Sequence, residues 1–375
     1  MTYVTAGTGH RRAAEAVADA ARERLPQSHV ACVDLLHYTP SWLRWAYPRS
    51  YEGMVRRCPA AWAALYRGVD WGPLFWLLQP VRRWWNAAVA SAYLRFVDAC
   101  RPDVIIVTHF FPAGVLADAK RRGRLRSRLI VVVTDLFPHR LWLAPEADAV
   151  VVGSDQTQAI YRRRGVADDR LHLLGIPIAS AFQRHVDRHA VLHALGLNPS
   201  RRTVLMAGGG MGVGPIAALM KRLATLEVTH PHQLQLIVVC GANAGLQHEL
   251  DRVAEISAMP VRVFGFVETM PELMGAADLL VTKAGGLTVM EALAMGLPMI
   301  FSASIPGQEA WNADYAVRSG AAVKARDPDD VMRLVDEFLR QPERLHAMQE
   351  RARAAGRPRA AVELVDQLII GHAPS

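Results

Sequence analysis

The stretch RTVLMAGGGMGVGPIAALMKRL (202–223) contains the structural unit from which most of this chain is built. A continuous apolar run leads into a turn rich in glycine, and an apolar helical segment follows. Continuous apolar runs, in contrast to strict alternation, are typical of parallel strands buried on both faces. The stretch therefore predicts a parallel strand, a tight turn and a helix, which is the βα unit of an α/β protein.

The same plan recurs on both sides of this stretch. The other predicted units span 103–114, 128–138, 148–165, 235–250, 261–277, 278–296 and 298–320. Between the two series, LHLLGIPIASAF (171–182) contains Gly175 and Pro177, where we expect a hinge. A chain of 375 residues is long enough for two domains of ordinary size. We predict two Rossmann-like, doubly wound domains that face a cleft, with ligands at the carboxyl ends of the strands.

The predicted domain boundaries follow from this division. Residues 1–178 form the first domain, residues 179–355 the second, and residues 356–375 a helix that packs back on the first. Only Met1–Thr5 precede the first glycine turn, so either the first strand is short or the chain starts earlier than Met1. The acidic run DPDD (327–330) is expected to be a turn and helix cap before a surface helix.

Composition indicates a folded chain: half of its residues are hydrophobic, and no low-complexity tract occurs. The four cysteines lack CxxC pairs or nearby histidine clusters, so we expect buried thiols in a reducing compartment and no metal site. No apolar run reaches the roughly 18–20 residues of a spanning helix, and we see no signal peptide. We expect a cytoplasmic protein, attached peripherally at most.

The region 41–95 has a different composition. It contains seven of the nine tryptophans and eight arginines, against the acidic residues Glu52 and Asp70. Aromatic rings beside guanidinium groups are typical of a membrane interface with anionic lipid, which also agrees with a net charge of +8. A helical insertion whose tryptophans pack on the core is the alternative, and a nucleic-acid partner is disfavoured because no binding motif accompanies the basic residues. The predicted membrane contacts are Trp42, Trp45, Trp76, Arg82, Arg83, Trp84 and Trp85.

Three glycine-rich junctions between strand and helix occur at 6–13, 207–215 and 283–292. Glycine lets the backbone approach a phosphate, and free amides at a helix N-terminus favour its negative charge. None is a Walker A motif, since no GKS or GKT follows. The first also lacks the third glycine of a dinucleotide fingerprint, because Arg12 stands at that position.

Polar residues near the last junction allow two interpretations. Thr288 and Glu291 have the spacing of a capping box, or Glu291 turns inward and accepts hydrogen bonds from ribose hydroxyls. Gln308 and Glu309 form an ordinary polar loop, or they hold the hydroxyls of a sugar.

Together these motifs resemble the monogalactosyldiacylglycerol synthase and processive diacylglycerol glucosyltransferase family. The matching segments are AGTGHRRAAEAV, VTDLFPH, AGGGMGVGPI, GFVETM, VTKAGGLTVMEALAMGLP and PGQEAWN, and the most specific pair is TKAGGLTVMEA followed by GQE. Members of this family are two-domain GT-B enzymes of glycosyltransferase family 28, related to the N-acetylglucosaminyltransferase of cell-wall synthesis. The resemblance implies a GT-B fold.

The resemblance also implies roles for particular residues. His10 would be the base that acts on the acceptor hydroxyl, with Gly7, Gly9, Asp135 and His139 on the acceptor side. Glu291 would bind the ribose, Gln308 and Glu309 the hexose, and Phe266 and Val267 would border the uracil. The full set of expected donor-binding residues is Gly208, Gly209, Gly210, Gly212, Phe266, Val267, Gly285, Gly286, Leu287, Thr288, Glu291, Gln308 and Glu309.

Physical chemistry supports a catalytic role for His10, although a histidine that merely caps its own helix is the alternative. The positive end of the helix dipole disfavours imidazolium, so we expect a neutral ring that can take a proton. We see no DxD pair that would bridge a diphosphate through a metal, so we expect no obligatory metal. We also expect no cofactor, because the sugar nucleotide is a substrate. The expected reaction is a single displacement that inverts the anomeric centre.

The expected function is the transfer of a hexose from a UDP-sugar to a membrane lipid, diacylglycerol in the first place, at the inner face of the cell membrane. The product would be a β-glycosyl lipid. Glucose, galactose and glucuronate remain open as the sugar. The alternatives are N-acetylglucosamine transfer to a polyprenyl-linked precursor, a nucleotide-sugar epimerase and a non-catalytic UDP-sugar sensor.

Overall fold

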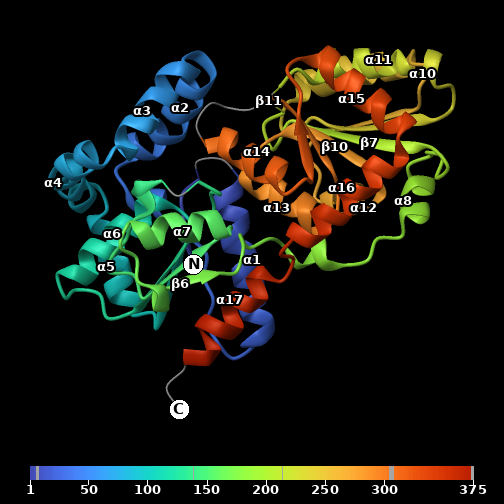
Figure 1. The fold of residues 1–375 in the computed structure, drawn as a ribbon. Coiled ribbons are helices and arrows are strands. Elements are labelled where there is room, and N and C mark those ends of the chain that lie inside the picture. Colours follow the sequence, from blue (N-terminus) through green and yellow to red (C-terminus); the bar gives the residue numbers. More distant parts are fainter. Residues whose placement is uncertain (6–7, 138, 213, 304–307, 373–375) are drawn as a thin grey trace. The chain divides into compact units, whose positions relative to one another are not determined.

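The computed structural model describes residues 1–5, 8–137, 139–212, 214–303 and 308–372. The chain divides into two compact units (Figure 1). The first is built mainly from Met1–Ser180 together with the segment that begins at Arg359, and the second mainly from Ala181–Ile305 and Glu309–Pro358. Both are parallel α/β units, as the apolar runs predict.

The first unit contains a six-stranded parallel sheet. Its strands are β1 (Thr2–Tyr3), β2 (Val33–Asp34), β3 (Val104–Val107), β4 (Arg128–Val132), β5 (Ala149–Val152) and β6 (Leu171–Leu173), in the order β2-β1-β3-β4-β5-β6. Helices α1 (Gly9–Arg24), α6 (Phe110–Arg121) and α7 (Asp155–Arg163) follow β1, β3 and β5. The strand order reverses between β1 and β3, and in such sheets ligands bind beyond the carboxyl ends of the strands at this point.

The last helix of the chain, α17 (Ala360–Leu368), belongs to this first unit. It packs against α1, and the two helices lie side by side in Figure 1. Val17 and Ala21 of α1 share a buried cluster with Leu364 and Val365 of α17. Alanines on α1 let the two backbones approach closely, so the helix pair covers one face of the sheet.

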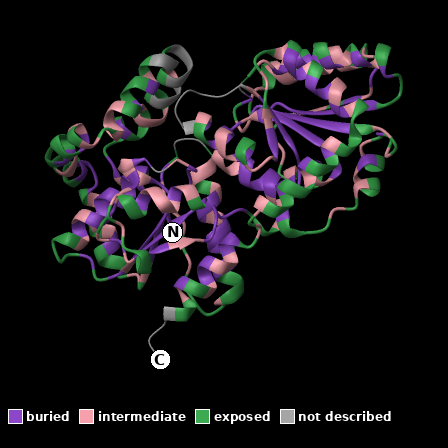
Figure 2. Cartoon of the chain, viewed as in Figure 1, coloured by how far each residue is buried: buried purple, intermediate pink, exposed green. Residues whose placement is uncertain are grey.

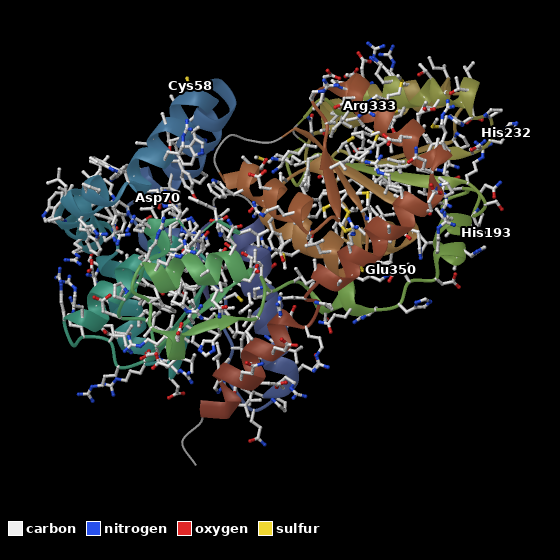
Figure 3. The ribbon with its side chains drawn as sticks, viewed as in Figure 1. Cys58, Asp70, His193, His232, Arg333 and Glu350 are labelled. Carbon is white, nitrogen blue, oxygen red and sulfur yellow. The ribbon has the colours of Figure 1, made fainter. Side chains whose placement is uncertain are left out.

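The region rich in tryptophan and arginine forms four successive helices, α2 (Ser41–Arg57), α3 (Pro59–Asp70), α4 (Gly72–Val89) and α5 (Ser91–Cys100). Asp70 ties them to the rest of the unit, because its carboxylate pairs with Arg164 at 2.9 Å and accepts from the Arg140 amide at 2.7 Å (Figure 3). Among the described residues, no helix is both long and apolar enough to cross a bilayer.

The second unit contains the other six-stranded parallel sheet. Its strands are β7 (Arg202–Ala207), β8 (Leu234–Val239), β9 (Val261–Phe264), β10 (Leu279–Lys283), β11 (Met299–Ala303) and β12 (Ala322–Lys324), in the order β12-β11-β10-β7-β8-β9. The helices around it are α8 (Arg188–Ala194), α9 (Ile216–Ala224), α10 (Leu226–Thr229), α11 (Ala244–Glu255), α12 (Met270–Ala276), α13 (Gly286–Ala294), α14 (Gln308–Arg318), α15 (Pro328–Arg340) and α16 (Pro342–Ala355). Its central strands are buried on both faces (Figure 2).

Two local predictions have opposite outcomes. The expected cap at 327–330 is confirmed, because the Asp327 carboxylate accepts from the Asp330 amide at 2.8 Å and α15 begins at Pro328. The expectation of buried thiols is wrong for Cys58, which lies between α2 and α3, and for Cys100, which ends α5. Both are exposed because they occupy helix ends at the surface, where no neighbouring layer covers them.

Candidate functional site

The first group of candidate residues lies where the strand order of the first unit reverses. His10 is in the first turn of α1, directly after β1, and Thr108 follows the adjacent strand β3. Thr134 follows β4, the next strand in the sheet. Parallel strands end at the same edge of a sheet, so three residues far apart in sequence meet at one place.

The His10 ring is fixed by two hydrogen bonds. Its Nδ1 lies 2.7 Å from the Thr108 carbonyl oxygen and 2.8 Å from Thr134 Oγ1. A carbonyl oxygen only accepts, so Nδ1 carries the proton and Nε2 of the neutral ring carries the lone pair. Thr108 Oγ1 in turn donates to the His10 carbonyl at 2.8 Å. The histidine therefore does not cap its own helix, whose N-cap is Thr8.

The pKa of His10 lies below its ordinary value, which agrees with the neutral ring expected from the sequence. Burial is the main cause, because desolvation disfavours the imidazolium form. The negative charge of Asp135 and the hydrogen bond to Thr108 act in the opposite direction with smaller effect. Burial, which the position of His10 in the sequence does not reveal, therefore dominates in keeping the ring neutral.

Two aromatic side chains, Trp142 and His109, lie beside the His10 ring. The buried Asp135 carboxylate accepts from Trp142 Nε1 at 3.0 Å, and the Trp142 ring lies 6.1 Å from the His10 ring. His109 is closer, with 4.6 Å between ring centroids, and burial lowers its pKa well below the ordinary value. Its Nδ1 accepts from the Phe111 amide at 3.1 Å and so caps α6.

His139 lies deeper than its expected place on the acceptor side implies. The ring is fully buried, its Nε2 lies 2.9 Å from the Tyr66 carbonyl, and its Nδ1 accepts from the Leu141 amide at 3.0 Å. Nε2 therefore links His139 to α3, whereas Nδ1 caps the short helix η2 (Arg140–Trp142). Of the two predicted glycines, Gly9 begins α1, whereas Gly7 lies outside the described residues.

The second group of candidate residues begins with the glycine loop after β7, which contains Gly208, Gly209, Gly210 and Gly212. Gly212 has φ +59°, and a Cβ built there would lie 2.1 Å from the Cys240 carbonyl oxygen. The Ala242 amide donates to the Gly210 carbonyl at 2.9 Å. The loop is therefore folded tightly against the end of the adjacent strand β8, which only glycine permits.

Helix α13 begins at Gly286, with Gly285 as its N-cap and no side chain capping it. The capping-box interpretation of Thr288 and Glu291 is therefore wrong, because Thr288 is already the third helical residue. Leu287 and Thr288 complete the first turn, and Glu291 is buried. Asn312 of α14 donates through Nδ2 to the Ala284 carbonyl at 3.0 Å, which fixes the turn before the helix.

Lys283, which the sequence analysis did not identify as a candidate, lies beside the glycine loop that follows β7. It ends β10, and a Cβ at Gly209 would lie 3.0 Å from its Cε. Its ammonium group forms an ion pair with the buried carboxylate of Glu309. Gln308 begins α14, but its side chain lies outside the described residues. A cation, the glycine amides and the start of α13 together form an environment suited to an anion such as a diphosphate.

Phe266 and Val267 follow β9 at the same edge of the sheet. The Phe266 side chain is 57% exposed and Val267 is half-buried. An aromatic ring that is largely accessible to solvent is available to a planar ligand. Among the described residues, no three His, Cys, Asp or Glu side chains gather as a metal site requires.

Five of the tryptophans predicted to contact a membrane are exposed, by fractions that range from 39% at Trp85 to 70% at Trp84. We call them the tryptophan face: Trp42, Trp45, Trp76, Trp84 and Trp85. The alternative in which they pack on the core is wrong for these five. Arg83 is partly exposed and pairs with Asp118, whereas Arg82 lies inward, with its guanidinium over the Phe75 ring.

Comparisons with known proteins agree with this geometry. The monogalactosyldiacylglycerol (MGDG) synthase profile matches residues 10–178, and the glycosyltransferase family 28 C-terminal domain matches residues 203–364. The chain is 30% identical over 297 residues to a processive diacylglycerol beta-glucosyltransferase of Bacillus thuringiensis (strain Al Hakam), covering 77% of this chain and 75% of that one.

Solved structures share the fold at low sequence identity. MurG of Acinetobacter baumannii aligns with a TM-score of 0.63 at 16% identity, over 98% of each chain. A UDP-N-acetylglucosamine 2-epimerase homologue from Listeria monocytogenes aligns with a TM-score of 0.63 at 14% identity, over all of this chain and 97% of that one. The fold is therefore of the predicted GT-B type. With the two domain matches and the Bacillus relative, the chain belongs to the monogalactosyldiacylglycerol synthase and processive diacylglycerol glucosyltransferase family, and it is a glycosyltransferase.

Proposed function

We propose that this enzyme transfers a hexose from a UDP-sugar to the free hydroxyl of diacylglycerol, with inversion at the anomeric carbon. The observation that carries the proposal is the orientation of His10. Its Nδ1 is bonded to the Thr108 carbonyl, so Nε2 of the neutral ring is free to act as a general base. The diacylglycerol relatives support the lipid acceptor.

In the proposed reaction, His10 Nε2 takes the proton of the lipid hydroxyl while its oxygen forms a bond to the anomeric carbon. The bond between that carbon and the UDP oxygen breaks, and UDP leaves with the electron pair. Attack opposite to an α-linked diphosphate gives a β-glycoside. Because the pKa of His10 is lowered, the ring is neutral and able to accept this proton near neutral pH.

The second unit supplies the proposed donor site. The glycine loop after β7, the first turn of α13 and Lys283 would bind the diphosphate and stabilise the charge that develops as UDP leaves. Glu291 would accept from the ribose hydroxyls, Gln308 and Glu309 from the hexose, and Phe266 would stack on the uracil. The ion pair with Lys283 already fixes the carboxylate of Glu309 in this region.

The decisive experiment offers four sugar donors with diacylglycerol vesicles. UDP-glucose, UDP-galactose, UDP-glucuronate and UDP-N-acetylglucosamine are tested separately, with UDP release and glycolipid followed by mass spectrometry. We expect turnover that depends on the lipid and on one hexose donor. Turnover with UDP-N-acetylglucosamine alone, or UDP binding without any turnover, would contradict the proposal.

We also propose that the tryptophan face attaches the enzyme to the inner surface of the membrane. Replacement of Trp84 and Trp85 by alanine should weaken binding to vesicles by about tenfold or more, because each buried ring contributes roughly 1.5–3 kcal/mol. Vesicle flotation measures this effect, and UDP binding should not change. Val228→Ala with Ile256→Ala is the matched control, since both side chains are highly exposed but lie in the second unit. Equal loss in both double variants would contradict the assignment.

A change at Asp135 should move the pH profile of the enzyme. Since its negative charge raises the pKa of His10, Asp135→Asn should lower that pKa further. The base is active when deprotonated, so activity falls as the pH drops through the pKa of His10. We expect the acidic limb of kcat/KM to lie at lower pH than for an ordinary histidine in the wild type, and to shift to still lower pH in the variant. An acidic limb that stays in place would show that another group is titrating.

A further inference from the structure

A basic pocket lies in the first unit, apart from the residues assigned above to catalysis and donor binding. It has a volume of about 140 Å³ and lies among α4, α5, α6 and the segment that follows α6. The side chains that matter for its chemistry are Arg83, Asn86, Ser91, Arg95, Arg122 and Arg124.

The charge of this pocket is strongly unbalanced. Asp118 is the carboxylate in its wall, and it is already shared by Arg83 at 3.3 Å and Arg121 at 2.9 Å. Within the described part of the chain, Arg95 and Arg122 form no ion pair. Arg124 lies 3.9 Å from Asp98, so Arg95 and Arg122 are the lining guanidinium groups that have no acidic partner. Such groups beside a concave surface favour an anion, and their planar forks match phosphate oxygens.

Asn86 gives the pocket a polar floor. Its side chain is only 5% exposed and lines the cavity. Among the residues that the structure describes, this side chain has no hydrogen-bond partner. Since Ser257 Oγ is the fully buried polar side-chain atom that lacks a partner among the described residues, the Asn86 amide is accessible from the pocket and can donate a hydrogen bond to a ligand there. Ser91 supplies a hydroxyl in the same wall.

The position of the pocket favours a lipid over a free ion. Arg83 in its wall directly precedes Trp84, the most exposed ring of the tryptophan face, on α4. If the pocket held the phosphate of a glycerophospholipid, the acyl chains of that lipid would lie next to exposed apolar side chains. Other exposed apolar residues of α4, Leu77 and Val81, extend that surface.

We propose that this pocket binds the phosphate of an anionic glycerophospholipid that is distinct from the acceptor. The inference extends the membrane attachment proposed above, and it adds recognition of one headgroup chemistry to general adhesion. Arginines would bind the phosphate oxygens, and Asn86 and Ser91 would donate the additional hydrogen bonds.

Vesicle binding by the full chain tests the proposal. Flotation is measured with phosphatidylcholine vesicles that contain phosphatidylglycerol, and with vesicles made equally negative by oleate, which carries no phosphate. The test variant is R95Q/R122Q. The control is R163Q/R252Q, which removes the same charge at two arginines outside the pocket. A third arm titrates inorganic phosphate.

The wild type and the control should bind phosphatidylglycerol vesicles more tightly than oleate vesicles. R95Q/R122Q should lose that preference, because each arginine removed should lower the affinity for phosphatidylglycerol vesicles about fivefold. Equal binding of both vesicles by the wild type would overturn the proposal, as would equal losses in the two variants. Inorganic phosphate binding that depends on the pocket, without a vesicle preference, would assign the pocket to free phosphate instead. Retained binding to phosphatidylcholine would still support the tryptophan face, so the two proposals fail separately.

Discussion

Replacement of His10 by alanine is expected to lower kcat for glycosyl transfer by about 10²–10⁴-fold, the contribution typical of a positioned general base. The reason is specific to this ring, because the Thr108 carbonyl leaves Nε2 of the neutral ring as the lone-pair nitrogen. UDP binding should be unchanged, since the proposed donor residues all come from the second unit or from α14. Turnover under saturating substrate and calorimetric titration with UDP measure the two quantities.

A graded variant separates catalysis from folding. Thr134→Val removes only the second contact to Nδ1, so the Thr108 carbonyl still selects the same tautomer. We expect a much smaller fall in kcat than for His10→Ala. If His10→Ala keeps kcat within about tenfold of the wild type, another group acts as the base.

Gly212→Ala is expected to abolish measurable UDP binding and to destabilise the second unit. Alanine at φ +59° costs about 1–3 kcal/mol in backbone conformation alone. Its Cβ would also lie 2.1 Å from the Cys240 carbonyl, a contact that backbone can relieve only by moving the loop away from β8. Thermal unfolding and UDP titration should show both effects together.

Gly245→Ala is the matched control for this prediction. Gly245 lies in α11, and a Cβ there would meet Asn243 at an ordinary 3.7 Å. Alanine favours the helix over glycine, so UDP binding should persist with equal or higher stability. Normal UDP affinity in Gly212→Ala would show that this loop does not contact the donor.

The sequence predicts the repeated βα architecture well because long apolar runs and glycine turns are local signals. The start of α13 is harder to predict, since Thr288 and Glu291 satisfy the spacing of a capping box while Gly285 takes the N-cap position. Cys58 and Cys100 are exposed because no other element covers the helix ends at which they lie. The spacing of cysteines along the chain does not tell which helix ends are covered.

The environment of His10 illustrates what a sequence alone withholds. Thr108 and Thr134 lie 98 and 124 residues from His10, and only the strand order brings them to its ring. Each follows an apolar run, in VTHFF and VVTDL, so a polar residue directly after a predicted strand was the available signal. Arg82 lies over the Phe75 ring while Trp84 is exposed, and this difference could not be predicted without knowing how α4 packs on the unit.

The pairing of α17 with α1 has a consequence for how the protein is made. During translation, α1 emerges before the second unit, yet the helix that covers Val17 and Ala21 emerges only after that unit. Domains generally fold as the ribosome delivers them, and contacts between distant segments form slowly. The first unit must therefore wait, with an apolar strip of α1 uncovered, until the second unit has been synthesised. The last step in the folding of the first unit is therefore the packing of α17 against α1, the helix of this unit that is synthesised first.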